Sequence, residues 1–315
     1  MRLSEGVLFH LAKRLYHTGL AHSADMKEAL SDDESFHQYR RDCLGKVLVA
    51  AEQYGVDIRG RDVLDLGCSD GALTPFYVTA GARHVTGVDI DEAAVRSAEQ
   101  KYASETVDFS VCDTTTIPLP GASYDCVMCY DVFEHVANPA EVLAECCRVL
   151  KPGGKMLIGT WGWYHPFAPH LWSTMPVPWA HLFFSESTVL RTCRRVYQAD
   201  WYVPNMHDFA PDGTRIADKY THESISKDYL NKYLISDFEA AFRKSGLRFT
   251  IHPQPFGSKW ASWTRCLLGV PLLREFITSY IWVVLERPSQ PAATGSQTEC
   301  GVTPNPHTEL LALSP

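Results

Sequence analysis

The stretch Val63-Leu-Asp65-Leu-Gly67-Cys-Ser-Asp70-Gly71 decides the fold. It places an apolar run directly before two glycines with acidic neighbours, and a helical pattern follows from 72 to 79. This order predicts a short buried strand, a tight loop and the start of a helix. Glycine has no Cβ and tolerates positive φ, so the loop lets the backbone approach a ligand closely, and the first amides of the helix can donate to it. The stretch therefore indicates a site for a nucleotide-like ligand.

Strand and helix signals alternate regularly from Arg61 to Thr160. Strands are predicted at 63–66, 84–88, 107–111, 126–129 and 155–160, and helices at 72–80, 91–103 and 139–150. This alternation predicts an α/β fold with a doubly wound, mostly parallel sheet and helices on both faces. Ligands of such sheets bind beyond the carboxyl ends of the strands, near the switch in strand order. The loop from Gly67 to Gly71 is expected there.

The segments outside this alternation differ from it in composition. Residues 161–224 hold five of the eight tryptophans and five of the thirteen histidines, which predicts an inserted lid that builds the substrate pocket. The apolar pattern of Leu3, Val7 and Leu11 predicts a helix that packs on the main domain, with a lid or a membrane-surface helix as the alternatives. We predict a helical lid at 1–44, a core at 45–160, the insertion at 161–224, the C-terminal part of the core at 225–287 and a disordered tail at 288–315.

The C-terminal part of the core has its own predicted elements. An amphipathic helix is expected from 226 to 245, with strands at 247–252 and 276–285.

Composition argues against several classes of protein. A net charge of −8 disfavours binding to a phosphate backbone, and no apolar run approaches the ~20 residues of a membrane span. Ten cysteines without a disulfide framework indicate reduced thiols in a cytoplasmic protein. Cys126 and Cys129 lie three apart on a predicted strand and should face opposite sides, so we expect no shared metal or redox role.

Four linked signals carry a family resemblance. They are Asp65-Leu-Gly67-Cys-Ser-Asp-Gly71, then Gly87-Val-Asp89, then Asp113, and finally Lys151-Pro-Gly-Gly154. In this order and spacing, residues 45–160 resemble class I S-adenosylmethionine-dependent methyltransferases. A dinucleotide fold would instead show G-x-G-x-x-G in the first turn, which disfavours a nicotinamide dehydrogenase. The resemblance implies a seven-stranded Rossmann-like sheet and S-adenosylmethionine as the cofactor.

The resemblance also implies which residues bind the cofactor. These are Asp65, Gly67, Gly71, Asp89, Ile90, Asp113, Thr114, Tyr130 and Asp131. Asp65 would accept from the ammonium group of the methionine end, and Asp89 from the ribose hydroxyls. Asp113 would accept from the adenine amino group. Asp70 keeps two interpretations, a helix cap or a ligand contact, and Phe36 and Tyr39 are expected to close over the cofactor.

Catalysis on an oxygen or nitrogen acceptor needs a base with a pKa near neutrality, commonly histidine. We predict His135, His165 and His170 for this role or for acceptor contact. We expect no metal. The alternative is that Asp131-x-x-Glu134-His135, which resembles the metal-binding block of ubiquinone O-methyltransferases and small-RNA 2′-O-methyltransferases, holds a divalent ion with His165, His170 or His207.

One further cluster is basic. Arg191, Arg194 and Arg195 share a helix face, either as a solvated surface or as a site for an acidic group of the acceptor.

The sequence thus predicts a methyltransferase that acts on a small-molecule acceptor. A natural-product or quinone-like acceptor is favoured over RNA, and oxygen slightly over nitrogen or carbon. Peripheral membrane contact is left open. The alternatives are a non-catalytic module that binds the cofactor or a partner, and a cofactor-dependent enzyme that does not methylate.

Overall fold

The computed structural model describes residues 3–18, 31–113, 115–210, 212–217, 219–221, 224–225, 230–256 and 266–289. The predictions made for Thr114, for the beginning of the helix at 226–245 and for most of the tail at 288–315 lie outside these residues.

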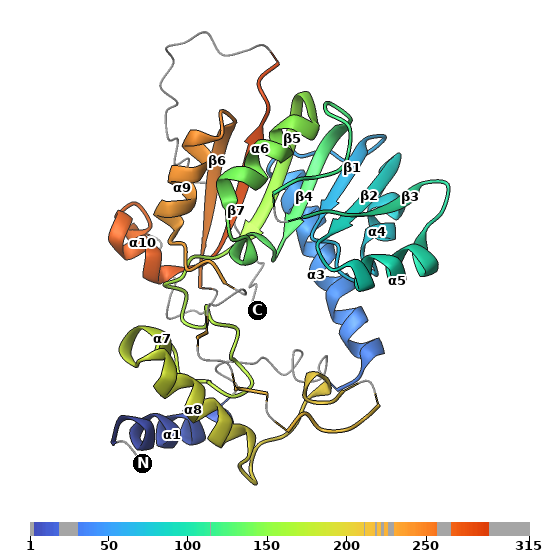
Figure 1. The fold of residues 1–315 in the computed structure, drawn as a ribbon. Coiled ribbons are helices and arrows are strands. Elements are labelled where there is room, and N and C mark those ends of the chain that lie inside the picture. The colour runs from blue at the N-terminus through green and yellow to red at the C-terminus, as the bar shows by residue number, and fades with distance from the viewer. Residues whose placement is uncertain are drawn as a thin grey trace.

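A seven-stranded sheet forms the centre of the larger part of the molecule (Figure 1). Its strands are β1 (Asp62–Leu66), β2 (His84–Asp89), β3 (Val107–Val111), β4 (Tyr124–Tyr130), β5 (Leu150–Thr160), β6 (Arg248–Pro255) and β7 (Thr278–Glu286). Their order is β3-β2-β1-β4-β5-β7-β6, and β7 is antiparallel to both neighbours. The predicted doubly wound, mostly parallel sheet is confirmed. Because the order reverses between β1 and β4, the loops after these two strands lie side by side.

Helices cover both faces of the sheet. The described helices are α1 (Leu3–Tyr16), α3 (Asp33–Gln53), α4 (Thr74–Thr79), α5 (Glu92–Tyr102), α6 (Pro139–Val149), α7 (Ala180–Phe183), α8 (Glu186–Tyr197), α9 (Ile235–Lys244) and α10 (Pro271–Ile277). On one face α6 and α9 bury Leu143 and Phe238, and on the other α3 and α4 bury Val47 and Tyr77.

The alternation of side chains along β4 sorts its cysteines between these two faces. Cys126 belongs to the core under α3, and Cys129 to the core under α6 and α9. The prediction that the two thiols point to opposite faces is confirmed, so this C-x-x-C pair cannot bind one metal ion.

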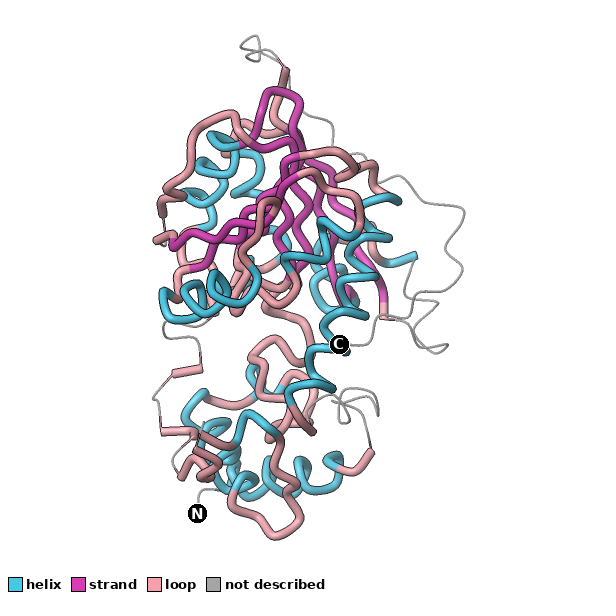
Figure 2. Tube along the Cα trace, turned by 90° about the vertical axis from the view of Figure 1, so that its right-hand side faces the viewer, coloured by secondary structure: helices cyan, strands magenta, loops and turns pink. Residues whose placement is uncertain are grey.

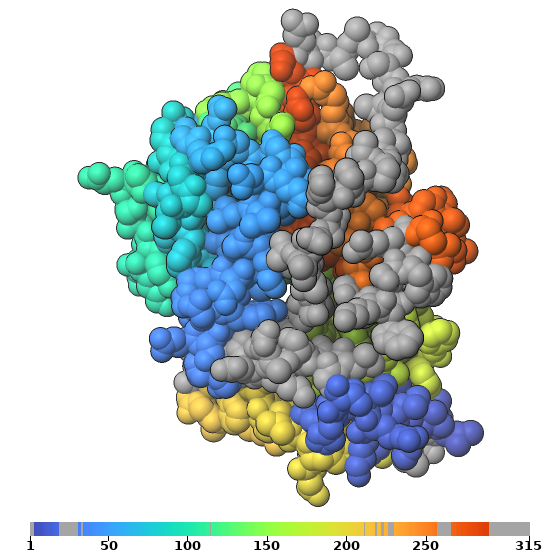
Figure 3. Space-filling view, turned by 180° about the vertical axis from the view of Figure 1, so that it is seen from behind, coloured from blue at the N-terminus to red at the C-terminus, as the bar shows by residue number. Residues whose placement is uncertain are grey.

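A second, smaller body lies below the sheet in Figures 1 and 2 and contains no strand of it. Its hydrophobic core joins Leu8 of α1 to Val189 and Val196 of α8. Figure 3 shows α1 (dark blue) at this lower end, whereas α3 (lighter blue) lies higher, against the sheet. The described parts of residues 1–44 therefore do not pack as one body, because α1 shares a core with α8 whereas α3 packs against the sheet. The other unit boundaries stay predictions.

The arginines of α8 tie this body together. The buried carboxylate of Glu5 accepts from Arg191 at 3.3 Å and from Arg195 at 3.2 Å. Arg194 donates to the backbone carbonyl of Tyr220. Arg194 is exposed and Arg191 and Arg195 are partly exposed, so the interpretation as a solvated helix face agrees with the structure, although two of the three arginines also pair with α1. A site for an acidic group of the acceptor stays a prediction.

Two element boundaries differ from the prediction. Helix α9 begins at Ile235, because the buried carboxylate of Glu275 accepts from the amides of Ile235 and Ser236 at 2.8 and 2.9 Å. The strand expected from 276 begins at Thr278, because Pro271 begins a helix that runs to Ile277. Both causes lie outside the local pattern that the prediction used.

Among the described helices, none combines the length and the apolar character that crossing a membrane requires.

Candidate functional site

Two cavities meet where the strand order reverses. The first has a volume of about 370 Å³ and lies under α3, and the second, of about 360 Å³, lies at the ends of β2 and β3. Gly67 and Val132 line both cavities. Gly67 has a φ of +81°, and a Cβ at this position would lie 2.3 Å from Val132 Cγ2. Only glycine therefore fits at the junction.

The second cavity is lined by two of the predicted cofactor-binding acids, Asp89 and Asp113, and by Ile90. The Oδ2 atom of Asp89 accepts from the amide of Ser69 at 2.8 Å, and its Oδ1 accepts from the amide of Asp91 at 3.0 Å. Each oxygen keeps a lone pair for a further donor. The ends of β2 and β3 thus bring Asp89 and Asp113 to one cavity, and their binding of the cofactor stays a prediction.

Asp65 is the buried acid at the loop end of the first cavity. It accepts from the hydroxyl of Thr74 at 2.7 Å. Burial raises the pKa of the Asp65 carboxyl to about 6, with the hydrogen bond from Thr74 opposing the rise. This carboxyl is thus poised to gain charge when a cation comes beside it.

Gly71 and Asp70 line neither cavity and instead contact other parts of the protein. Gly71 lines neither cavity, and a Cβ there would lie 2.5 Å from Ala98 Cβ, so this glycine is required by packing against α5. Asp70 accepts from the amide of Ala72 at 3.3 Å and pairs with Arg40 of α3 at 3.0 Å. The carboxylate of Asp70 therefore fixes α3 to the loop. It does not cap α4, whose N-cap residue is Leu73.

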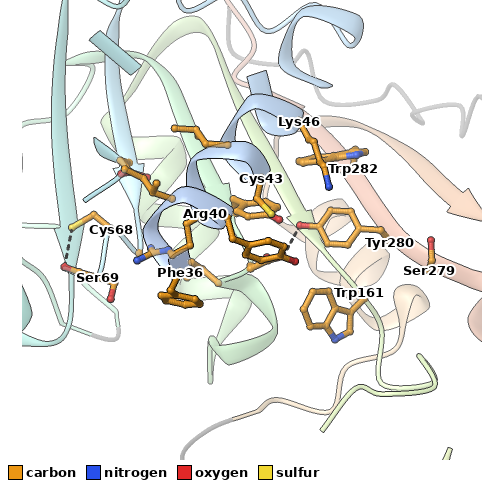
Figure 4. Close-up of a pocket in the computed structure, with 18 of the residues that line it drawn as sticks. Phe36, Arg40, Cys43, Lys46, Cys68, Ser69, Trp161, Ser279, Tyr280 and Trp282 are labelled. Atoms are coloured by element: carbon orange, nitrogen blue, oxygen red, sulfur yellow. Dashed lines mark hydrogen bonds between the residues drawn. The ribbon is translucent and has the colours of Figure 1, made fainter. Parts of the chain in front are cut away.

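Aromatic side chains form the rest of the first cavity (Figure 4). They are Phe36, Tyr39, Tyr77, Tyr130, Trp161, Phe167, Trp172, Tyr280 and Trp282. Tyr130 stacks on Trp282, with ring centroids 6.1 Å apart and planes 16° apart. Sequence reasoning missed Tyr280 and Trp282, although their i, i+2 spacing on a predicted strand places both on one face. The placement of Phe36 and Tyr39 over this cavity agrees with the expectation that they close the site.

Asp131 stands at the end of β4 with a φ of +53°, and it lines the first cavity. Its Oδ1 atom accepts from the hydroxyl of Tyr280 at 2.7 Å. Burial raises the pKa of the Asp131 carboxyl, and the nearby charge of Glu134 raises it further. A carboxyl of this kind, held beside the junction of the two cavities, is suited to accept a proton.

The three predicted catalytic histidines do not surround one cavity. His165 lines the first and His135 the second, while His170 lines neither, with its ring 5.0 Å from that of Trp161. Burial lowers the pKa of both His165 and His170 to about 3, so both are neutral. The Nδ1 atom of His165 accepts from the amide of Phe167 at 3.2 Å, which places the proton on Nε2. His165 is thus arranged to donate a hydrogen bond rather than to act as a base at Nε2.

A different trio brings possible metal ligands together. One ligand atom each from Glu134, His135 and His170 lies within 4.8 Å of the others. Glu134 also accepts from the hydroxyl of Thr160 at 2.7 Å. Asp131 is outside this group because it turns to Tyr280, so the alternative site of Asp131, Glu134 and His135 is not assembled among the described residues.

Comparison with known proteins bears on the N-terminal strands of the sheet and the loops between them. A sequence profile described as a methyltransferase domain matches residues 64–158. The chain carries a methyltransferase domain. A Mycolicibacterium smegmatis protein named a probable S-adenosylmethionine-dependent methyltransferase is 41% identical over 101 residues, 32% of this chain and 38% of that protein. A ubiquinone biosynthesis O-methyltransferase from Marinobacter nauticus is 36% identical over 110 residues, 33% of this chain and 46% of its own.

A solved S-adenosylmethionine dependent methyltransferase from Mesorhizobium loti has a TM-score of 0.44 at 15% identity, over 73% of this chain and 92% of its own. The chain spans less than half the length of the two curated relatives. The resemblance of the core to class I S-adenosylmethionine-dependent methyltransferases is confirmed.

The methyltransferase domain supplies one side of the site and the rest of the chain the other. The matched residues 64–158 include Asp65, Asp89, Asp113 and Asp131. The side chains that enclose the first cavity come mainly from α3, from the insertion and from β7, all outside that match. The similarity to relatives therefore covers the segment that carries these four acids. It does not extend to α3, the insertion and β7, which supply most of the walls of the first cavity.

Whether turnover requires a divalent metal ion can be tested directly. We expect formation of S-adenosylhomocysteine to be unchanged after treatment with EDTA, because the first acid of the block is held by Tyr280 and burial raises the pKa of Glu134. Loss of turnover that Mg²⁺ or Mn²⁺ restores would contradict this and would assign the ion to Glu134, His135 and His170. The measurement is product formation by chromatography with and without the chelator.

Proposed function

We propose that this protein transfers the methyl group of S-adenosylmethionine to a small-molecule acceptor. The observation that carries the proposal is the junction of two cavities, one with acids placed for a nucleoside and one walled by aromatic rings, beside a buried carboxyl. An oxygen on a natural-product or quinone-like acceptor is slightly favoured as the accepting atom.

The charged side chains of the two cavities fit the two ends of the cofactor. In the second cavity, Asp89 and Asp113 have free lone pairs for ribose hydroxyls and for the adenine amino group. In the first cavity, Asp65 faces the place of the ammonium group, and Arg40 reaches the same end from α3. A molecule with a nucleoside at one end and an amino acid at the other would pass over Gly67.

The cofactor supplies a methyl group on a positively charged sulfur, which is transferred by in-line displacement. The chain's own contribution is to position the acceptor and to keep water out, and positioning of this kind can lower a barrier by ~7 to 11 kcal/mol. Asp131 would accept the proton of an acceptor hydroxyl. Tyr280 donates to Asp131 and holds it in place, while Trp161 and Trp282 wall the cavity.

Two observations support the proposed acceptor, namely the lining of the first cavity and the name of a relative. The aromatic lining suits a flat, apolar molecule. The relative from Marinobacter nauticus is named a ubiquinone biosynthesis O-methyltransferase, which agrees with oxygen as the accepting atom. A non-catalytic module and a non-methylating enzyme are the alternatives, and formation of S-adenosylhomocysteine separates both from the proposal.

The first test is cofactor affinity. We expect S-adenosylhomocysteine to bind the wild-type protein in calorimetry, and Asp89→Ala to bind it at least tenfold more weakly, because hydrogen bonds to a charged group contribute ~1.5 to 3 kcal/mol each. Asp200→Ala, a change at an exposed acid of the smaller body, is the matched control. Absence of binding to the wild-type protein at millimolar ligand would overturn the proposed function.

The affinity should also depend on pH. The ammonium group of the ligand needs an ionised Asp65, and the pKa of this carboxyl in the free protein is about 6. Affinity should therefore rise by up to tenfold per pH unit below about 6 and level off above pH 7. Asp65→Asn should remove this slope. Calorimetry between pH 5 and 8 measures it, and an equal slope in the variant would show that another group is responsible.

The proposed base can be tested separately from binding. We expect Asp131→Asn to lower kcat by about a hundredfold or more, because an amide cannot take the proton, while the affinity for S-adenosylhomocysteine changes less than threefold. Turnover is measured on an acceptor found in a labelled-methyl screen, with Asp200→Asn as the control. A kcat within fivefold of wild type would exclude Asp131 as the base.

A further inference from the structure

One face of α3 lines the first cavity along most of the helix. Most of its residues there are three or four residues apart, a spacing that keeps side chains on one side of a helix. They are Phe36, Tyr39, Arg40, Cys43, Leu44 and Lys46. Figure 4 shows Phe36, Arg40, Cys43 and Lys46 following one another from the loop at Cys68 and Ser69 towards Trp282. Helix α3 thus brings two cations into a cavity that is otherwise mainly aromatic.

The two cations differ in what they already bind. Arg40 lies at the loop end and pairs with Asp70 at 3.0 Å. Lys46 is six residues further on, about 9 Å along the helix axis at 1.5 Å per residue. Within the described part of the chain, no carboxylate oxygen lies within 4.0 Å of Lys46 Nζ, and its ammonium group makes no hydrogen bond. Lys46 is partly buried and lines the first cavity, so its ammonium group is available to a ligand there.

The two acids that line the first cavity each have a hydrogen-bond partner other than Lys46. Asp65 accepts from Thr74 at the loop end, and Asp131 accepts from Tyr280 at the end of β4. Figure 4 places Lys46 next to Trp282, on the side of the cavity away from Cys68 and Ser69. The cation therefore belongs to the end of the cavity that the acceptor would occupy.

We propose that Lys46 binds an anionic oxygen group of the methyl acceptor. The acceptor is then an aromatic acid, with a flat apolar body against Trp282 and Tyr280, an acidic group at Lys46 and a hydroxyl at Asp131. This inference rests on the proposed function and names its substrate class. The other anion that could reach this cavity is the carboxylate of the cofactor, but Arg40 already stands at that end beside Asp65.

The experiment uses two probes of nearly equal shape, 6-hydroxy-2-naphthoate and 6-hydroxy-2-naphthamide, in which an anionic carboxylate is replaced by a neutral amide. Calorimetry is run on the full chain saturated with S-adenosylhomocysteine. We expect the acid to bind at least tenfold more tightly than the amide, and Lys46→Met to abolish this preference, because a charge-assisted hydrogen bond is lost. Lys101→Met, at an exposed position of α5, is the control for net charge and should keep the preference.

Each other outcome overturns the inference in a recognisable way. Equal affinity for acid and amide in the wild-type protein, or binding of neither, shows that this cavity does not select an aromatic acid. If Lys46→Met instead weakens S-adenosylhomocysteine by tenfold and leaves the preference intact, Lys46 serves the cofactor carboxylate. S-adenosylhomocysteine affinity is measured on its own beforehand, so its absence marks failure of the proposed function, separately from the result with the probes.

Discussion

The contact between Gly67 and Val132 is the constraint on which the site depends. It joins the loop after β1 to the loop after β4, at the point where the sheet reverses its order. Because a Cβ at Gly67 would overlap Val132, the two loops can approach only while that position is glycine. Their approach makes one continuous floor for both cavities. A ligand that bridges them is held by the two halves of the sheet at once.

Acidic and basic side chains occupy different parts of the site. Acids with hydrogen-bond capacity to spare lie at the β2 and β3 side, and two buried acids of raised pKa, Asp65 and Asp131, line the first cavity close to the junction. Among the described residues that line the two cavities, the arginine and the lysine both come from α3, which is fixed to the loop through Arg40 and Asp70. The electrostatics of the site therefore depend on a helix that precedes the methyltransferase domain. Movement of α3 would change the charge balance of the cavity as well as its volume.

The sequence predicted best what depends on local pattern. Strand alternation gave the sheet and placed Asp89 and Asp113 at neighbouring strand ends, because hydrophobic periodicity and turn chemistry decide both. It failed where a distant residue decides the structure. Helix α9 begins where Glu275 caps it, and Gly71 is a glycine because α5 packs against it. The cavity walls from β7 and the place of Lys46 were missed for the same reason, since no local signal says which far segment a side chain will face.

The pairing of Glu5 with α8 has a consequence for how the chain is made. Its partners Arg191 and Arg195 follow it by 186 and 190 residues. At ribosomal rates of roughly 5 to 20 residues per second, that interval lasts about 10 to 40 seconds. During this time the 14 residues of α1 have only marginal helical stability of their own, and the apolar face of Leu8 and Ala12 has nothing to cover it. Helix α1 must therefore wait for α8 to be synthesised before its apolar face is covered.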